Sequence, residues 1–152
     1  MKRNKLALFL HFVWATWDRQ PLITSDIERR LFRNMESQAQ GMGCIVLAIN
    51  GMPDHVHMVL SLPTTITIAD LVKQIKGVSS HFANETLQPR SKFKWQGSYG
   101  AFTVSRWDLD KIIAYVKRQK EHHEMNEIFQ EWEQVYEEMA SVERGDILLP
   151  AD

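Results

Sequence analysis

Four segments rich in aromatic and β-branched residues alternate with two amphipathic segments, and this order constrains the possible folds more than any other feature of the sequence. The strand-like segments are expected at residues 6–17, 44–50, 55–62 and 99–105. Helices are expected at residues 25–40 and 67–87, because each begins with a capping sequence followed by apolar residues at helical spacing. The order β-α-β-β-α-β predicts an α+β fold, a ferredoxin-like split βαβ antiparallel sheet with helices packed on one face. The other face would remain for a ligand or a second subunit.

The C-terminal part of the chain differs from the rest in charge. A third helix is expected from about residue 108 to at least residue 123, and a last helix over residues 126–140. Residues 1–119 hold 16 Lys and Arg against 9 Asp and Glu, whereas residues 120–152 hold 2 against 10. The net charge of −1 therefore conceals a basic body that could carry a nucleic-acid footprint. We divide the chain into a body at 1–124 and an acidic C-terminal helical extension at 125–152.

Composition and length exclude several classes of protein. The chain has 152 residues, 44% of them hydrophobic and 24% charged, which is typical of one globular domain and not of a disordered or collagen-like chain. The only cysteine, Cys44, excludes an internal disulfide and is expected to pack inside a strand. The apolar run at residues 6–17 is too short to span a bilayer and lacks a cleavage site. We expect a cytoplasmic protein with no membrane partner.

Two histidines at alternate positions of the third strand form the first candidate site. His55 and His57 share one face of that strand because side chains alternate, while Val56 and Met58 face the apolar layer. Two imidazoles at this spacing can bind one metal ion, with Asp54 or a backbone carbonyl fixing their tautomers. Most short His-x-His pairs are not metal sites, so taken alone the spacing favours two half-exposed histidines on an uncovered sheet face. His11, on the first strand, is expected to be an ordinary strand histidine.

Tyr115 and Gln119 form a second candidate pair on the third helix. Residues four apart are neighbours on one helix face, and both lie about a quarter-turn from the apolar stripe that includes Ile112 and Val116. A tyrosine hydroxyl can attack phosphorus and form a covalent intermediate, and a glutamine offers a neutral oxygen ligand. Spacing alone favours a boundary tyrosine beside a solvated glutamine.

A basic and aromatic segment precedes and includes the fourth strand. Residues 73–106 hold six Lys and Arg, and their one acidic residue is Glu85. Aromatic faces stack on bases and cations follow phosphates, so this composition is typical of single-stranded nucleic-acid binding. An exposed loop whose aromatic residues close the core explains the composition equally well. The DNA-binding candidates here and on the third helix are Arg90, Lys92, Lys94, Trp95, Tyr99, Arg106, Lys117 and Arg118.

Three stretches together resemble one known family. They are NGMPDHVHMVLSLP (50–63), WQGSYGAFTVS (95–105) and IIAYVKRQKEHH (112–123), and HFVWATWDRQPLI (11–23) also fits the family's first strand. The chain is similar to the insertion-sequence-200-like transposases, which belong to the HUH single-strand endonucleases and include the REP-associated tyrosine transposases. The resemblance runs from about residue 6 to residue 123. A His-hydrophobic-His alone is common, but it is specific together with the downstream Tyr-x-x-x-Gln.

The resemblance implies a role for each candidate residue. His55, His57 and Gln119 would match the ligands of a divalent metal, Mg²⁺ or Mn²⁺, and Tyr115 would match the single nucleophile. Such enzymes cut one DNA strand through a 5′-phosphotyrosine link and free a 3′-hydroxyl, which lets another strand rejoin. Their DNA partner is typically a hairpin near an element's ends. They work as homodimers in which the tyrosine helix often serves the partner's metal site. Residues 1–124 would be the catalytic domain.

We therefore predict a metal-dependent transposase that cleaves and rejoins single-stranded DNA. The alternative is a domesticated, sequence-specific hairpin-binding module without transposition activity, which would need none of this chemistry. A metal enzyme of another class would require a further strong ligand near His55. Asp54 is the nearest carboxylate in the sequence, but strand alternation is expected to point it away from both histidines.

Overall fold

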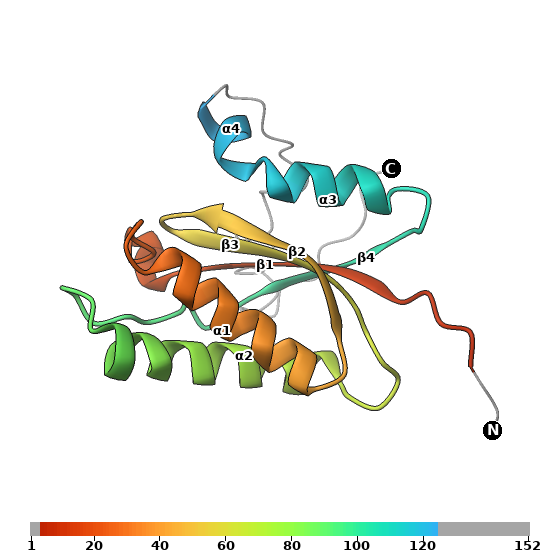
Figure 1. Ribbon diagram of the computed structural model, residues 1–152, viewed down its shortest axis with the longest axis horizontal. Coiled ribbons are helices and arrows are strands. Elements are labelled where there is room, and N and C mark those ends of the chain that lie inside the picture. Colours follow the sequence, from red (N-terminus) through yellow and green to blue (C-terminus); the bar gives the residue numbers. More distant parts are fainter. Residues whose placement is uncertain (1–3, 125–152) are drawn as a thin grey trace, which may run out of the picture.

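A four-stranded antiparallel sheet forms the centre of the computed structural model, which describes residues 4–124. Its strands are β1 (Phe9–Ala15), β2 (Ile45–Met52), β3 (His55–Ser61) and β4 (Gly100–Val104). They lie in the order β2-β3-β1-β4 (Figure 1). β1 occupies the middle and pairs with β3 from Phe9↔Ser61 to Ala15↔His55, and with β4 from Phe9↔Val104 to Val13↔Gly100. This order and the antiparallel pairing confirm the predicted α+β split βαβ fold.

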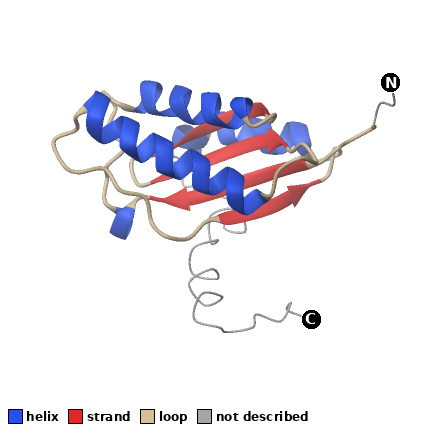
Figure 2. Ribbon diagram, turned by 90° about the horizontal axis from the view of Figure 1, so that it is seen from below, coloured by secondary structure: helices blue, strands red, loops and turns tan. Residues whose placement is uncertain are grey.

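Two crossover helices cover one face of this sheet, as predicted. They are α1 (Glu28–Gly41) and α2 (Ile68–Phe82), which lie side by side below the sheet in Figure 1 and in front of it in Figure 2. Between sheet and helices lies the larger hydrophobic core, built by alternate strand residues and by one stripe of each helix. Its fully buried members include Phe12, Trp14, Met58, Leu60, Leu31, Met35, Leu71 and Ile75.

The third predicted helix lies across the opposite face of the sheet. α3 (Leu109–Lys117) packs over β2 and β3 and closes a second, smaller core with Ala48, Val59 and Val104 (Figure 1). The face that we expected to remain open is therefore partly covered by the chain itself. The single helix predicted from residue 108 to 123 is broken at Arg118, whose ψ of 21° is not helical, and α4 (Gln119–Glu124) follows. The helix predicted over residues 126–140 lies outside the described residues.

Some strands and helices begin or end at residues other than those predicted, because local backbone geometry overrides the apolar pattern. β1 begins at Phe9, where pairing begins, although the apolar run starts at residue 6. After Ala15 the chain enters the 3-10 turn η1 (Trp17–Arg19), in which Asp18 and Arg19 have positive φ angles of 51° and 50°. The second helix ends at Phe82 and continues as one π-helical turn, η2 (Ala83–Leu87). None of the helices within residues 4–124 is long and apolar enough to cross a membrane.

Gly51, near the end of β2, allows the tight approach of β3. A Cβ atom at this position would lie 2.2 Å from the carbonyl oxygen of His55 and 2.9 Å from the Cα of Val56. Both neighbours are backbone atoms of a buried strand, so neither can move aside cheaply. The close approach brings the first histidine of β3 against β2 and fixes the hairpin register.

We predict that Gly51→Ala destabilises the protein, because the added methyl group must push the β3 backbone at His55. The expected loss is about 2 kcal/mol or more in the free energy of unfolding, measured by urea denaturation. Gly77→Ala is the matched control, because Gly77 lies on the exposed side of α2, where an added Cβ would meet nothing within 4 Å. It should stabilise the protein by about 0.5–1 kcal/mol through helix propensity. Equal effects of both substitutions would contradict the steric argument.

Candidate active site

The two histidines of β3 lie on the sheet face opposite the larger core. His55 and His57 are 1% and 0% exposed, and their ring centroids are 5.1 Å apart. Their neighbours Val56 and Met58 point into the larger core, as the period of two in a strand requires. The prediction that both imidazoles share a face is confirmed, but they are fully buried rather than half-exposed.

Asp54 orients the ring of His55. The Nδ1 of His55 donates to the Oδ1 of Asp54 at 2.7 Å, and the Nε of Arg19 donates to the other carboxylate oxygen at 3.2 Å. The hydrogen bond from His55, supported by the nearby Arg19 guanidinium, holds the pKa of Asp54 below its ordinary value despite partial burial. The expectation that Asp54 points away from both histidines is wrong, because Asp54 stands in the turn before β3, where strand alternation does not apply.

His57 has a partner that the sequence analysis treated as an ordinary strand residue. The Nε2 of His11 on β1 lies 2.9 Å from the Nδ1 of His57, and the two rings stack with centroids 5.1 Å apart. His11 is 1% exposed and stands diagonally across from His57, since His11 pairs with Val59 and Val13 pairs with His57. One nitrogen of this pair donates and the other accepts, so the contact couples the tautomer of His57 to that of His11. Only the strand register could have revealed this partner.

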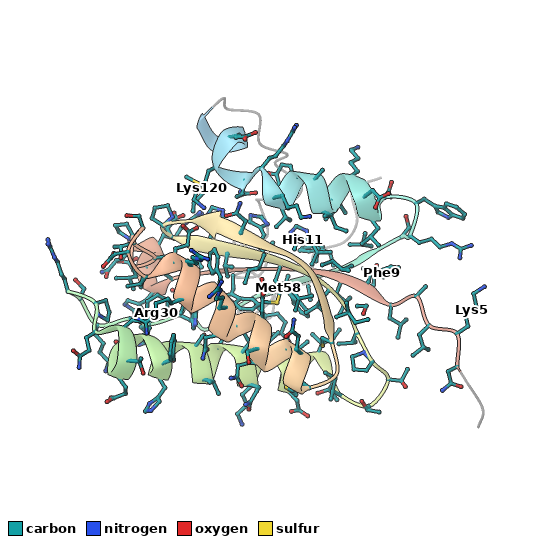
Figure 3. The ribbon with its side chains drawn as sticks, viewed as in Figure 1. Lys5, Phe9, His11, Arg30, Met58 and Lys120 are labelled. Atoms are coloured by element: carbon teal, nitrogen blue, oxygen red, sulfur yellow. The ribbon has the colours of Figure 1, made fainter. Side chains whose placement is uncertain are left out.

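Tyr115 and Gln119 reach the histidines from α3 and α4. Gln119 is fully buried, with its Nε2 3.4 Å from the Nε2 of His55, and the Tyr115 ring centroid is 6.2 Å from that of His57. Tyr115 is 3% exposed, so neither residue is the solvated boundary group that spacing alone favoured. Figure 3 shows His11 on the α3 side of the sheet, where these groups gather. The structure therefore brings together all four residues predicted for metal binding and nucleophilic attack.

Polar contacts hold α3 and α4 in this position. The side-chain amide of Asn50, on β2, donates to the carbonyl oxygen of Lys117 at 3.0 Å. The Nζ of Lys120, at the start of α4, donates to the Oδ1 of Asn50 at 2.8 Å and to Glu28 of α1. The contacts tie the break between the two helices to the end of β2. Gln119 is placed over His55 by this anchoring as much as by its spacing from Tyr115.

The donor groups suit a divalent cation. Among residues 4–124 no cluster of three His, Cys, Asp or Glu could hold a metal, so the third donor here would be an amide. The Nδ1 of His55 is hydrogen-bonded to Asp54, and the Nδ1 of His57 is hydrogen-bonded to His11. In both rings the other nitrogen is Nε2. Rotating the side-chain amide of Gln119 by a half-turn about its Cγ–Cδ bond exchanges the positions of Oε1 and Nε2. Oε1 then lies where Nε2 stood, 3.4 Å from the Nε2 of His55. Two imidazole nitrogens and one amide oxygen fit Mn²⁺ well and Mg²⁺ less well.

Three comparisons with known proteins agree with one another. The family model described as "Transposase IS200 like" matches residues 4–119. The ISDra2 transposase TnpA of Deinococcus radiodurans is 30% identical over 115 residues, covering 72% of this chain and 81% of the relative. The transposase for insertion sequence element IS200 of Salmonella typhimurium is 25% identical over 122 residues, covering 77% of this chain and 80% of the relative. The chain belongs to the IS200-like transposase family.

Solved structures share the fold of this transposase. A candidate transposase from Deinococcus radiodurans R1 is 26% identical with a TM-score of 0.58, covering 78% of this chain and 98% of the other. A REP-associated tyrosine transposase bound to a REP hairpin has a TM-score of 0.60 at 14% identity, covering 81% and 74%, and this likeness concerns the fold alone. The family predicted from the three sequence stretches is therefore confirmed.

The predicted DNA-binding residues of this transposase separate into exposed cations and packed aromatics. The cations Arg90, Lys92, Lys94, Arg106, Lys117 and Arg118 are all exposed. Trp95 is only 6% exposed and donates its indole N–H to Ser79 at 2.9 Å, so its ring belongs to the larger core and is closed to a base. Tyr99 is partly buried against the same core. Trp95 and Tyr99 therefore make the contacts that core closure requires, whereas Phe102 on β4 is 38% exposed.

We predict that His11→Phe destabilises the transposase, because it keeps a flat ring but removes the hydrogen bond to the buried His57. The loss of this bond should cost about 1–3 kcal/mol in the free energy of unfolding, measured by urea denaturation. His11→Gln is the matched variant, since its amide can reach the position of Nε2 and retain the bond, and it should lose clearly less. A Phe variant as stable as the wild type would show that the contact contributes only packing.

Proposed function

We propose that this transposase cleaves and rejoins single-stranded DNA, with Tyr115 as the nucleophile and a divalent metal held by His55, His57 and Gln119. The observation that carries this proposal is the convergence of four side chains from β3, α3 and α4 within one chain. These residues are up to 64 positions apart in the sequence, and all are 3% exposed or less. Buried polar groups cost free energy unless they are hydrogen-bonded, and clusters of them are typical of functional sites.

The Nε2 atoms of His55 and His57 and the Oε1 of Gln119 would hold the metal, Mg²⁺ or Mn²⁺. When bound, such an ion polarises a phosphate oxygen and stabilises the charge that develops on phosphorus. The protein prepares both histidines through their other nitrogens. For Nε2 to present a lone pair, Nδ1 must carry the proton, and the Asp54 carboxylate accepts a hydrogen bond from that N–H of His55. On this proposal the Nδ1–H of His57 donates a hydrogen bond to the Nε2 of His11, which acts as a neutral acceptor.

Tyr115 supplies the covalent chemistry of the proposal. Its phenolic oxygen forms a bond to the scissile phosphorus and loses its proton, while the bond from phosphorus to the 3′-oxygen breaks and that oxygen gains a proton. The products are a 5′-phosphotyrosine and a free 3′-hydroxyl. A 3′-hydroxyl from another strand reverses the step and restores the phenol. Since each step exchanges one phosphodiester for another, no nucleotide cofactor is required.

The DNA substrate is proposed to be a hairpin with a single-stranded flank. A structural neighbour of the same fold is bound to a REP hairpin, and the exposed cations of this chain offer phosphate contacts. Lys117 and Arg118 are exposed and stand in the chain between the buried residues Val116 and Gln119, so positive charge lies next to the candidate site. A homodimer is proposed from the family resemblance. One chain already brings Tyr115 beside its own His57, so a partner's tyrosine is not needed to complete the group.

We predict that the wild-type protein forms a covalent adduct with a labelled single-stranded hairpin in the presence of Mn²⁺, and that Tyr115→Phe does not. The adduct would be seen as a labelled band in a denaturing gel, and at least a hundredfold loss is expected because the nucleophile is removed. Tyr99→Phe is the control, since Tyr99 packs beside the larger core on the other side of the sheet. An adduct that persists in Tyr115→Phe would contradict the assignment. Hairpin binding without any wild-type adduct would favour the domesticated binding module.

We also predict that the protein binds Mn²⁺ and that His57→Ala and Gln119→Ala weaken this binding by about tenfold or more, because each removes a donor atom. Titration calorimetry or Mn²⁺ electron paramagnetic resonance measures the affinity without DNA. His81→Ala is the matched control, because His81 is exposed on α2 on the opposite side of the sheet. Equal affinity in His57→Ala, Gln119→Ala and His81→Ala would refute the proposed ligand set.

A further inference from the structure

Trp17 is an exposed aromatic residue that the function proposed so far does not use. Its side chain is 45% exposed, and the Nζ of Lys94 lies 3.7 Å from its ring centroid. The backbone N–H of Trp17 donates to the carbonyl oxygen of Lys94 at 2.9 Å, so the ring and the ammonium group are set side by side by the main chain. An exposed indole next to a cation combines a surface for a base with a charge for a phosphate.

The strand pleat places this pair on the same face as the candidate active site. Thr16 and Trp95 form a bridge and are both buried, Trp95 in the larger core. Backbone hydrogen bonds on both sides of this bridge, from Trp17 N–H to Lys94 and from Gln96 N–H to Ala15, continue the antiparallel pairing as far as Trp17. Side-chain alternation therefore still applies at this point and assigns Trp17 and Lys94 to the opposite face. Ala15 lies on that face and pairs directly with His55. At about 3.3 Å per residue, Trp17 follows Ala15 by roughly 7 Å.

The backbone around Trp17 is held in an unusual conformation. Asp18 and Arg19 both adopt positive φ angles, which favour glycine and cost free energy in other residues. Two side-chain contacts hold the turn: the amide of Gln96 accepts from the N–H of Asp18 at 3.1 Å, and Arg19 donates to Asp54. Since Asp54 also accepts from His55, one carboxylate joins the turn to the candidate site. A ring fixed in this way loses little freedom when a flat ligand stacks on it.

We propose that Trp17 and Lys94 form a stacking platform for an unpaired base of single-stranded DNA, next to the phosphate held at the His55 and His57 site. The proposal deepens the proposed function and rests on it for the identity of the ligand. The indole would stack on the base, and the Lys94 ammonium would neutralise a neighbouring phosphate. A paired base in a duplex hides its faces, so the platform selects single-stranded DNA next to the cleavage point.

The chain provides its own control for this platform. Trp107 is 81% exposed, and the guanidinium carbon of Arg106 lies 4.7 Å from its ring centroid. Trp107 follows the end of β4 at Val104, which pairs with Phe9 at the start of β1. The distance along β1 from Phe9 to Ala15 is roughly 20 Å, so the Trp107 pair lies at the far end of the sheet from His55. It offers the same chemical groups in the wrong place.

The test measures binding of the full chain to a short unstructured oligodeoxynucleotide by fluorescence anisotropy. Trp17→Ala should weaken binding about tenfold, the usual effect of losing one stacked base, whereas Trp17→Phe and Trp107→Ala should stay near the wild type. An abasic strand of equal length keeps the phosphates but has no bases, and it should bind wild type and Trp17→Ala equally. In an oligonucleotide containing 2-aminopurine, quenching of its fluorescence on binding should be reduced in Trp17→Ala, a signal that lost stability would not produce in a folded variant.

Each other outcome overturns the platform. Equal loss in Trp17→Ala and Trp107→Ala, or equal loss on the abasic strand, would show a general effect of charge or folding. Failure of wild-type binding to the oligonucleotide would also overturn it. Adduct formation by Tyr115 is scored separately on the hairpin: an adduct that forms normally while Trp17→Ala binds like wild type overturns the platform and leaves the proposed function standing. If no adduct forms but Trp17→Ala still weakens binding to the normal strand and not to the abasic strand, the proposed chemistry is contradicted and the platform is supported.

Discussion

The register between β1 and β3 is the constraint on which the rest of this structure depends. It pairs Ala15 with His55 and Val13 with His57, and it thereby places His11 diagonally against His57. A slip of one residue would turn the histidines into the larger core and expose Val56, Met58 and Leu60 on the other face. Because the larger core is assembled from these same strands, the free energy that folds the protein also fixes the position of the candidate site.

One face of the sheet contributes mainly to stability, and the other holds the polar side chains of the candidate site. The face toward α1 and α2 is apolar and closely packed, with Trp14, Met58 and Leu71 fully buried. The other face buries imidazoles, an amide and a phenol, each of which needs polar partners to be tolerated away from water. Asp54 and His11 supply such partners through the Nδ1 atoms of the two β3 histidines. Polar side chains on this face are therefore held in one orientation before any substrate arrives.

The sequence predicted much of this arrangement because its strongest signals are local. A period of two placed His55 and His57 on one face, and helical spacing placed Tyr115 near Gln119. What could not be predicted depends on pairing between distant segments. His11 became a partner of His57 only through the strand register, and Trp95 entered the core through its bridge with Thr16. The break at Arg118 and the turn at Asp18 reflect backbone angles that no apolar pattern encodes.

Burial of the candidate site sets a requirement on how DNA reaches it. His57 and Gln119 are fully buried and Tyr115 is 3% exposed, so on the proposed function a phosphate is admitted by movement of a larger unit than one side chain. α3 is the element with the weaker hold. It buries Ile112, Tyr115 and Val116, whereas α1 and α2 together place seven buried residues in the larger core. Elements with fewer buried contacts open at a lower free energy.

Movement of α3 would carry Tyr115 and Gln119, the proposed nucleophile and the proposed amide ligand, together. Tyr115 and Gln119 stand on either side of the break at Arg118, and Asn50 ties that break to β2. Lifting this unit would separate both residues from the β3 histidines at once and leave the larger core untouched. On the proposed function, an ion shared by the histidines and Gln119 would favour the closed arrangement, since it binds donors from both sides. Substrate entry, metal binding and assembly of the nucleophile would then be one coupled equilibrium, set by how firmly the smaller core holds α3.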